Sequence, residues 1–355
     1  MGIKVRIRKK LGNFNLDVSL ESNMDRIGIL GASGAGKSMT LRCIAGIEEP
    51  DEGLIEVDGR VLYDSGKGIC LKPQKRKVGY LFQNYALFPT MTVLENVEAG
   101  IREGRKNERR EKALTILERF GIREMKDRFP DEISGGQQQR TALARILASE
   151  PRMILLDEPF SALDGYLRDQ MLMEVLDMLR DFQGPVILVS HNRDEIYRFS
   201  EDLLVLEKGS SLVCGKTREI FREPVYREAA KLTGCRNFCR IRKLGTHCFL
   251  ALDWGIEVET QGLVPDDSDC IGYRAHDFVP VWKKRQKNCI PVQLHSASEL
   301  PFEFNYYFRP AGSGTGPLIC WVVQRDQAME ISGKGMPDFL RVREEQILYL
   351  KPRKC

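Results

Sequence analysis

A glycine-rich loop between an apolar run and a helix-like segment constrains the fold of this chain most. Residues 26–30 read as a short buried strand, and residues 37–46 have helical character and end at Gly46. Between them stands the pattern G-x-x-x-x-G-K-S. Strand, loop and helix in this order place backbone N–H groups and a helix N-terminus around phosphates. The pattern therefore predicts a nucleotide phosphate loop, and a plain glycine turn is the alternative. The predicted ATP-binding residues are Gly31, Ala32, Ser33, Gly34, Ala35, Gly36, Lys37, Ser38 and Met39.

A second apolar run, residues 153–156, ends in the two acids Asp157 and Glu158. In a sheet that carries a phosphate loop, such a strand lies beside the first, although a strand end facing water is the simpler alternative. We expect Asp157 to contact Mg²⁺, directly or through water, together with the Ser38 hydroxyl, and Lys37 to reach the outer phosphates. Glu158 is then the candidate general base that activates a water molecule.

His191 follows a third apolar run, residues 186–190. Ligands of open α/β sheets bind at the carboxyl ends of the strands, which is where this side chain is expected. We predict that His191 contacts the γ-phosphate and holds the water and Glu158 in line, rather than being only structural. Glu158 and His191 are the two predicted catalytic residues.

The pattern of strands and helices divides the chain into two regions. Strands alternating with helices predict an α/β fold for residues 1–232, with a mainly parallel sheet and a helical subdomain over about 84–150. Residues 233–355 contain short β-branched or aromatic runs separated by Gly, Pro and Asp, which predict a small β-barrel.

Residues 134–137, Ser-Gly-Gly-Gln, complete a set of motifs that resembles the ATP-binding-cassette (ABC) ATPases over roughly residues 1–230. The resemblance implies ATP hydrolysis with Mg²⁺ by two cassettes stacked head to tail. The signature residues would then act on the partner's ATP: Ser134, Gly135, Gly136 and Gln137. Gln83 would bind Mg²⁺ and report its presence to a membrane subunit. A further loop would cross the dimer interface: Ser161, Ala162, Leu163 and Asp164.

The residue that stacks on adenine is not identified by these patterns. Related cassettes often place an aromatic side chain 20 to 25 residues before the phosphate loop, and residues 6–11 contain none. Phe14 is the nearest aromatic candidate, although it also suits a core position. Arg8 is the alternative, because a guanidinium stacks on aromatic rings.

Residues 60–89 resemble the ATPase subunits of molybdate import systems more than those of sugar, sulfate or polyamine importers. The resemblance implies a peripheral protein on the cytoplasmic face of the membrane, bound to permease subunits and served indirectly by an extracellular binding protein. Tyr85, Leu87 and Phe88 are candidates for the apolar surface that meets the permease, with a core role as the alternative. Import of tungstate, sulfate, polyamine or iron remains open. In the C-terminal domain, a regulatory oxyanion site and a dimerising or structural role are both open.

Composition limits the other function classes. The formal net charge is only +4, from 54 basic and 50 acidic residues, so no nucleic-acid partner is expected. No apolar stretch approaches the length of about 18 residues that a membrane helix needs. A soluble cassette ATPase of translation or DNA repair is the remote alternative, since such proteins usually carry tandem cassettes or a coiled coil.

Overall fold

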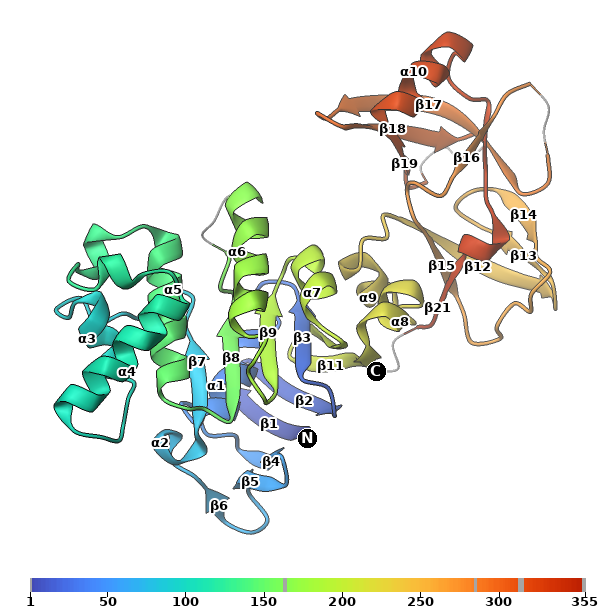
Figure 1. Cartoon of the computed structure of the whole chain (residues 1–355). Coiled ribbons are helices and arrows are strands. Elements are labelled where there is room, and N and C mark those ends of the chain that lie inside the picture. Colours follow the sequence, from blue (N-terminus) through green and yellow to red (C-terminus); the bar gives the residue numbers. More distant parts are fainter. Residues whose placement is uncertain (1, 162–164, 284–285, 312–315, 353–355) are drawn as a thin grey trace. The chain divides into compact units, whose positions relative to one another are not determined.

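The computed structural model describes residues 2–161, 165–283, 286–311 and 316–352 (Figure 1). The chain forms two compact units, Met1–Arg218 and Glu219–Cys355. The division therefore precedes the sequence-based boundary at 232/233. In the described residues no helix is both long and apolar enough to span a membrane.

An eleven-stranded sheet forms the centre of the first unit, in the order β6-β5-β4-β1-β2-β11-β10-β3-β9-β8-β7. The pairs among β10, β3, β9, β8 and β7 are parallel, whereas those from β6 to β2 are antiparallel. The strands are β1 (Ile3–Leu11), β2 (Phe14–Ser22), β3 (Arg26–Gly31), β4 (Glu52–Val57), β5 (Arg60–Asp64), β6 (Ile69–Cys70), β7 (Val78–Leu81), β8 (Met153–Asp157), β9 (Val186–Ser190), β10 (Asp202–Glu207) and β11 (Ser210–Lys216).

The parallel half of the sheet positions the candidate site. All residues of β8 and β9 are buried, as expected for central strands covered on both faces. In the pairing of β3 with β9, Leu30 lies opposite Ser190, and in the pairing of β8 with β9, Asp157 lies opposite Val189. The carboxyl ends of β3, β9 and β8 therefore meet at one edge, where the loops that follow them converge.

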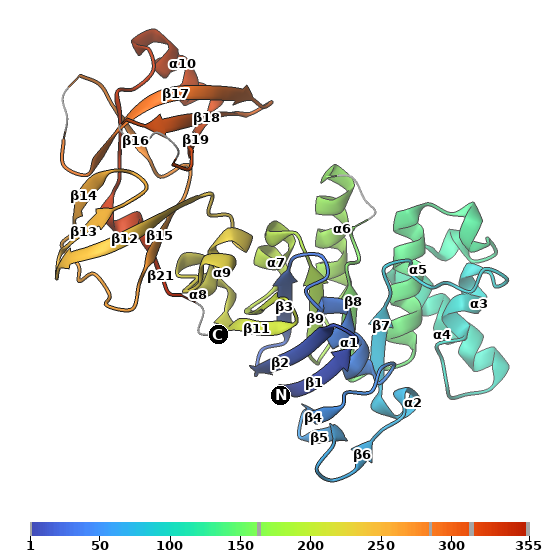
Figure 2. The same cartoon turned by 180° about the vertical axis from the view of Figure 1, so that it is seen from behind.

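The helices of the first unit flank this sheet, and α3, α4 and α5 gather beside its β7 edge in both views (Figure 1; Figure 2). These three form the helical subdomain that the sequence predicts. The helical segments are α1 (Lys37–Ala45), α2 (Pro73–Arg76), α3 (Val93–Glu98), α4 (Lys106–Arg119), η1 (Arg123–Met125), η2 (Pro130–Glu132), α5 (Gly135–Ala148), α6 (Gly165–Met178) and α7 (Arg193–Phe199).

The helix after the phosphate loop is fixed at its C-terminus by Arg76. This buried guanidinium donates to the carbonyl oxygens of Cys43 and Ile44, each at 2.8 Å. Gly46 ends α1 in the left-handed conformation, with φ of 79°. Because Arg76 satisfies carbonyls that the helix leaves free, it ties the C-terminus of α1 to α2.

The second unit is the small β domain that the sequence predicts, and its strands form two five-stranded antiparallel sheets. One aromatic core, including Phe249, Trp254 and Phe308, draws on both sheets. The elements are α8 (Thr217–Arg222, which begins in the first unit), α9 (Arg227–Leu232), β12 (Asn237–Gly245), β13 (Cys248–Ala251), β14 (Ile256–Glu259), β15 (Cys270–Tyr273), β16 (Val279–Val281), β17 (Cys289–Glu299), β18 (Glu303–Pro310), β19 (Ile319–Gln324), α10 (Arg325–Lys334), β20 (Phe339–Arg341), η3 (Glu344–Gln346) and β21 (Leu348–Leu350).

Candidate functional site

The loop between β3 and α1 owes its shape to its glycines. Gly34 and Gly36 have φ of 76° and 98°, in the left-handed region that other residues rarely adopt. A Cβ atom on Gly36 would lie 2.6 Å from a Leu16 methyl carbon. The loop therefore curls tightly in front of α1, where N–H groups and the helix N-terminus favour an anion.

Lys37 is the first residue of α1, and its side chain contacts this loop. Its ammonium donates to the carbonyl oxygens of Gly31 and Ala32 at 3.0 and 3.1 Å, and it pairs with Glu158 at 3.2 Å. The side chain is buried, so its charge is stabilised by these contacts rather than by water. The predicted phosphate-binding lysine and the predicted general base are thus in contact.

Asp157, at the end of β8, accepts two hydrogen bonds. The Ser38 hydroxyl donates to Oδ1 and the Tyr80 hydroxyl donates to Oδ2, each at 2.7 Å. Burial, followed by the hydrogen bond to Asp157, raises the pKa of Tyr80. A hydroxyl and a carboxylate supply the oxygen ligands that Mg²⁺ prefers, so Ser38 and Asp157 fit the predicted metal role.

The residue after β8 adopts an unusual backbone conformation. Glu158 has φ of 45°, and its N–H donates to the Val189 carbonyl oxygen at 3.1 Å. Its Oε2 atom lies 3.1 Å from His191 Nδ1. Left-handed non-glycine residues persist only where their surroundings hold them, often at functional sites. The structure thus brings both predicted catalytic residues together.

A buried carboxylate supports the loop that carries His191. Ser190 donates its hydroxyl to Glu195 at 2.6 Å and accepts from the Asn192 N–H at 2.9 Å. Arg168 of α6 lies 3.5 Å from Glu195. Burial raises the pKa of Glu195. This group links α6 and α7 to the His191 loop, and sequence reasoning did not find it.

Gln83 contacts the loop after Glu158. Its amide nitrogen donates to the Ser161 hydroxyl at 3.0 Å, and that hydroxyl donates to the Glu158 carbonyl oxygen at 3.0 Å. Ser161 therefore connects the Gln83 side chain to the backbone of Glu158. The remaining predicted residues of that loop lie outside the described residues: Ala162, Leu163 and Asp164.

The proposed permease-facing side chains have different environments. Tyr85 is buried and Leu87 is half-buried, whereas Phe88 is 45% exposed. Arg145 of α5 lies 5.0 Å above the Phe88 ring and donates to the Tyr85 carbonyl oxygen at 3.1 Å. Phe88 is thus the most exposed of the three side chains.

The signature segment stands apart from these groups. Ser134 caps α5: its N–H donates to Gln137 Oε1 at 2.9 Å, and its hydroxyl accepts from the Gln137 N–H at 3.4 Å. Gly135 is exposed, and a Cβ atom there would meet nothing within 4 Å. Gly136 faces Met171 of α6. Among the described residues, no hydrogen bond or ion pair joins residues 134–137 to the phosphate loop.

The two candidates for the adenine contact also differ. Arg8 is held between Asp17 and Glu52, at 3.1 and 3.3 Å. The Phe14 ring is half-buried beside the loop, since a Cβ atom on Gly36 would lie 3.2 Å from it.

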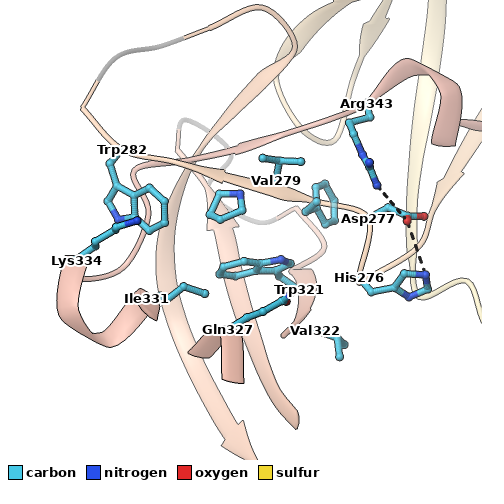
Figure 3. A pocket seen from close by; sticks show the side chains of 12 residues that line it. His276, Asp277, Val279, Trp282, Trp321, Val322, Gln327, Ile331, Lys334 and Arg343 are labelled. Atoms are coloured by element: carbon cyan, nitrogen blue, oxygen red, sulfur yellow. Dashed lines mark ion pairs between the residues drawn. The ribbon is translucent and has the colours of Figure 1, made fainter. Parts of the chain in front are cut away.

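A cavity of about 350 Å³ opens in the second unit (Figure 3). Trp282, Trp321 and Ile331 form apolar walls, and Lys334 lies beside the Trp282 ring at 5.5 Å. On another wall, Asp277 is paired with His276 and Arg343 at 3.7 and 3.6 Å. The cavity therefore combines an aromatic surface with a charged wall, and its lining does not identify one ligand class.

Comparisons with known proteins match the first unit. A family model described as ABC transporter matches residues 13–161. The molybdate/tungstate import ATP-binding protein WtpC of Archaeoglobus fulgidus is 38% identical over 221 residues, 62% of this chain and 90% of that protein. The molybdenum import ATP-binding protein ModC of Paramagnetospirillum magneticum is 38% identical over 218 residues, 61% of this chain and 60% of that protein.

An iron relative is similarly close. The Fe(3+) ions import ATP-binding protein FbpC of Haemophilus influenzae is 42% identical over 208 residues, 58% of this chain and 59% of that protein. The matches to ModC and FbpC thus span about 60% of those relatives' length.

Solved structures resemble the same part of the chain. A dimeric post-hydrolysis state of the ATP-binding cassette MJ0796, bound to ADP and phosphate, matches with a TM-score of 0.51 and 29% identity, covering 61% of this chain and 99% of that one. The structure of cbiO1 from Clostridium perfringens, part of the ABC transporter complex cbiONQ, has a TM-score of 0.55 and 26% identity, with coverage of 64% and 92%.

Proposed function

This chain belongs to the ABC transporter family, and we propose that its first unit binds ATP with Mg²⁺ and hydrolyses it to ADP and phosphate. The continuous set of contacts from Lys37 to Glu158 and from Glu158 to His191 carries the proposal. These contacts bring Lys37, Glu158 and His191 together, which supports the proposed roles of a phosphate-binding cation, a general base and a residue that orients the base.

The side chains divide the reaction between them. The loop N–H groups, the N-terminus of α1 and the Lys37 ammonium hold the phosphates. Ser38 and Asp157 would hold Mg²⁺, which neutralises charge on the phosphate oxygens when bound. Lys37 is paired with Glu158 in this structure and would exchange part of that contact for phosphate oxygens when ATP binds.

Glu158 then acts on water. The water oxygen forms a bond to the γ-phosphorus, the bond from that phosphorus to the β–γ bridging oxygen breaks, and the water proton passes to Glu158 Oε. His191 holds Glu158 in place at 3.1 Å and reaches the γ-phosphate. General-base catalysis of this kind contributes on the order of 10²- to 10⁴-fold to the rate.

The proposal extends to a head-to-tail dimer. The exposed Gly135 and the N-terminus of α5 offer N–H groups to an anion, and no acceptor from the described phosphate loop reaches them. The ATP bound to a second copy of the chain would then lie against this segment. Gln137 and Ser134 are already ordered by their mutual hydrogen bonds for this contact.

We propose transport of an oxyanion, molybdate first, through a partner permease. The molybdenum and molybdate/tungstate names of two relatives support this cargo. Iron import is the second candidate, because the FbpC relative is 42% identical.

As the ATPase of such an importer, the cassette would lie on the cytoplasmic face of the membrane, and the second unit would serve regulation or oligomerisation. ATPase stimulation by the reconstituted permease with molybdate, tungstate, sulfate or ferric ion separates these cargoes.

Substitution Glu158→Gln tests the hydrolysis step. The amide keeps the side-chain shape but accepts no proton, so we expect ATP to be bound and not hydrolysed. The protein should then elute as an ATP-dependent dimer by size exclusion with light scattering. Glu118→Gln, on an exposed pair with Arg123, is the control and should stay monomeric and active. Full turnover by Glu158→Gln would refute the role of Glu158 as base.

A further inference from the structure

Tyr80 contacts the carboxylate that would hold Mg²⁺. The residue lies on β7, which pairs in parallel with β8, and its register partner is Leu155. Its hydroxyl donates to Asp157 Oδ2 at 2.7 Å. The other carboxylate oxygen, Oδ1, accepts from Ser38 at the same distance. Each oxygen of Asp157 therefore has its own donor.

Two donors on opposite oxygens fix the rotation of a carboxylate. Turning the Asp157 group about its Cβ–Cγ bond would break both hydrogen bonds, and the side chain is buried where water cannot replace them. Oδ1 is thus directed toward Ser38, and Oδ2 is directed toward the phenol. A metal beside Ser38 would meet Oδ1 while Oδ2 remains engaged.

The Tyr80 ring has a separate packing role. It contacts Phe82, with ring centroids 4.3 Å apart, and packs against the core of the first unit. A phenylalanine would fill the same space. The hydroxyl is therefore the part of the residue whose function packing does not explain.

From this geometry we propose that Tyr80 is a positioning residue that restricts Asp157 to a single metal-facing oxygen and thereby favours Mg²⁺ over Ca²⁺. The proposal rests on the ATPase function proposed above. Mg²⁺ requires near-octahedral geometry with few carboxylate oxygens, whereas Ca²⁺ accepts six to eight ligands and bidentate carboxylates. Freeing Oδ2 would remove the constraint that disfavours Ca²⁺.

Tyr80→Phe removes the hydroxyl and keeps the ring. Tyr63→Phe is the matched control, because the buried Tyr63 hydroxyl donates to the Pro50 carbonyl oxygen at the same 2.7 Å but does not contact Asp157. The readout is equilibrium binding of a fluorescent, non-hydrolysable ATP analogue during separate titrations with Mg²⁺ and Ca²⁺. Thermal melting without metal or nucleotide measures the structural cost of each substitution.

We expect Tyr80→Phe to raise the Mg²⁺ concentration at half-saturation by about 3- to 10-fold, the net value of one typical hydrogen bond. The preference for Mg²⁺ over Ca²⁺ should fall, and analogue binding without metal should not change. Tyr63→Phe should leave all three quantities at the wild-type level. The inference is wrong if Tyr80→Phe gives the same metal titrations as the wild-type protein. It is also wrong if Tyr80→Phe weakens analogue binding equally with and without metal. Absence of metal-dependent binding in the wild-type protein would instead refute the proposed ATPase function.

Discussion

The phosphate loop and the signature segment are both glycine-containing turns that open a helix, but their surroundings differ. Lys37, at the start of α1, is buried and bonded to its own loop and to Glu158. Ser134 and Gly135, at the start of α5, are exposed and bonded within their own segment. Gly36 has φ of 98° and no room for a side chain, whereas Gly135 has open space around it.

This difference indicates that the two segments meet different requirements. The conformation of Gly36 is demanded by the fold of the chain itself, because the backbone turns there against Leu16. Nothing among the described residues demands a glycine at position 135. A contact made outside the single chain explains a small residue at that position, as the head-to-tail dimer proposes.

Mixing two inactive variants gives the largest effect and can break this comparison. Lys37→Ala and Gly135→Asp should each lower ATP hydrolysis about 100-fold or more, since the first removes a positive charge at the phosphates and the second introduces a negative charge beside them. In a mixed dimer one site combines the intact loop of the Gly135→Asp chain with the intact signature of the Lys37→Ala chain. Phosphate release should therefore recover to as much as about a quarter of the wild-type rate.

The result is decisive in either direction. Recovery on mixing requires that loop and signature come from different chains. Mixed dimers that are demonstrated by light scattering and remain inactive would contradict the shared site. Mixing Lys37→Ala with Glu158→Gln is the control, because both changes affect the same side of the site and no intact pair results.

His191→Ala tests the orienting role on the loop side. The side chain contacts Glu158 Oε2 at 3.1 Å, so its loss should lower kcat by about 10²-fold while ATP binding is retained. Single-turnover phosphate release and a separate binding titration measure the two quantities. His247→Ala, an exposed histidine in the second unit, is the control. A loss of binding equal to the loss of kcat would contradict an orienting role.

Alanine at the two glycines compares folding stability directly. Gly36→Ala should destabilise the first unit by about 1–3 kcal/mol, because alanine is strained at positive φ and its Cβ would overlap Leu16. Gly135→Ala should change stability by less than about 0.5 kcal/mol. Denaturant unfolding of the nucleotide-free protein measures both. Equal destabilisation by the two substitutions would remove the distinction drawn above.

The smallest effect concerns the carboxylate under the His191 loop. Burial raises the pKa of Glu195 above its ordinary value of 4.5, so the folded protein holds this proton to a higher pH than the unfolded chain. The protonated Glu195 therefore contributes stability to the folded protein below pH 4.5, and this contribution is lost as pH rises through the folded-state pKa of Glu195. Glu195→Gln keeps the acceptor for Ser190 and lacks the titration.

Melting temperatures measured upward from pH 4.5 should therefore fall less steeply for Glu195→Gln than for the wild-type protein. Glu118→Gln is the exposed control and should follow the wild-type curve. If Glu195→Gln follows the wild-type curve, the contacts of Glu195 with Ser190 and Arg168 offset the effect of burial on its pKa completely.

Much of the first unit was predictable because its motifs combine a local pattern with an apolar strand. The fold class, the helical subdomain and the C-terminal β domain are confirmed. The pairs Ser38 with Asp157 and Glu158 with His191 also lie in contact, as the phosphate-loop helix and the two strand ends suggest. The antiparallel half of the sheet was not anticipated, because alternation of polar and apolar residues does not specify the direction of a strand's neighbour.

Tyr80 and Glu195 show why the rest of the site was missed. Tyr80 matters because β7 pairs with β8, and strand order is set by packing of the whole sheet rather than by residues 78–81. Glu195 looks like an ordinary acid in the first turn of a helix, and only its burial against Ser190 gives it a further role. The sequence around Tyr80 and around Glu195 does not indicate which side chain each of them contacts.

By itself, the sequence determined that a phosphate loop, two acids and a histidine would stand at the ends of three buried strands. These features are local, since glycine conformations and apolar runs act over a few residues. The tertiary structure decided which oxygen of Asp157 faces Ser38 and which faces Tyr80, and left the signature glycine exposed. Such contacts depend on strand order and on burial, which arise only when distant segments pack together.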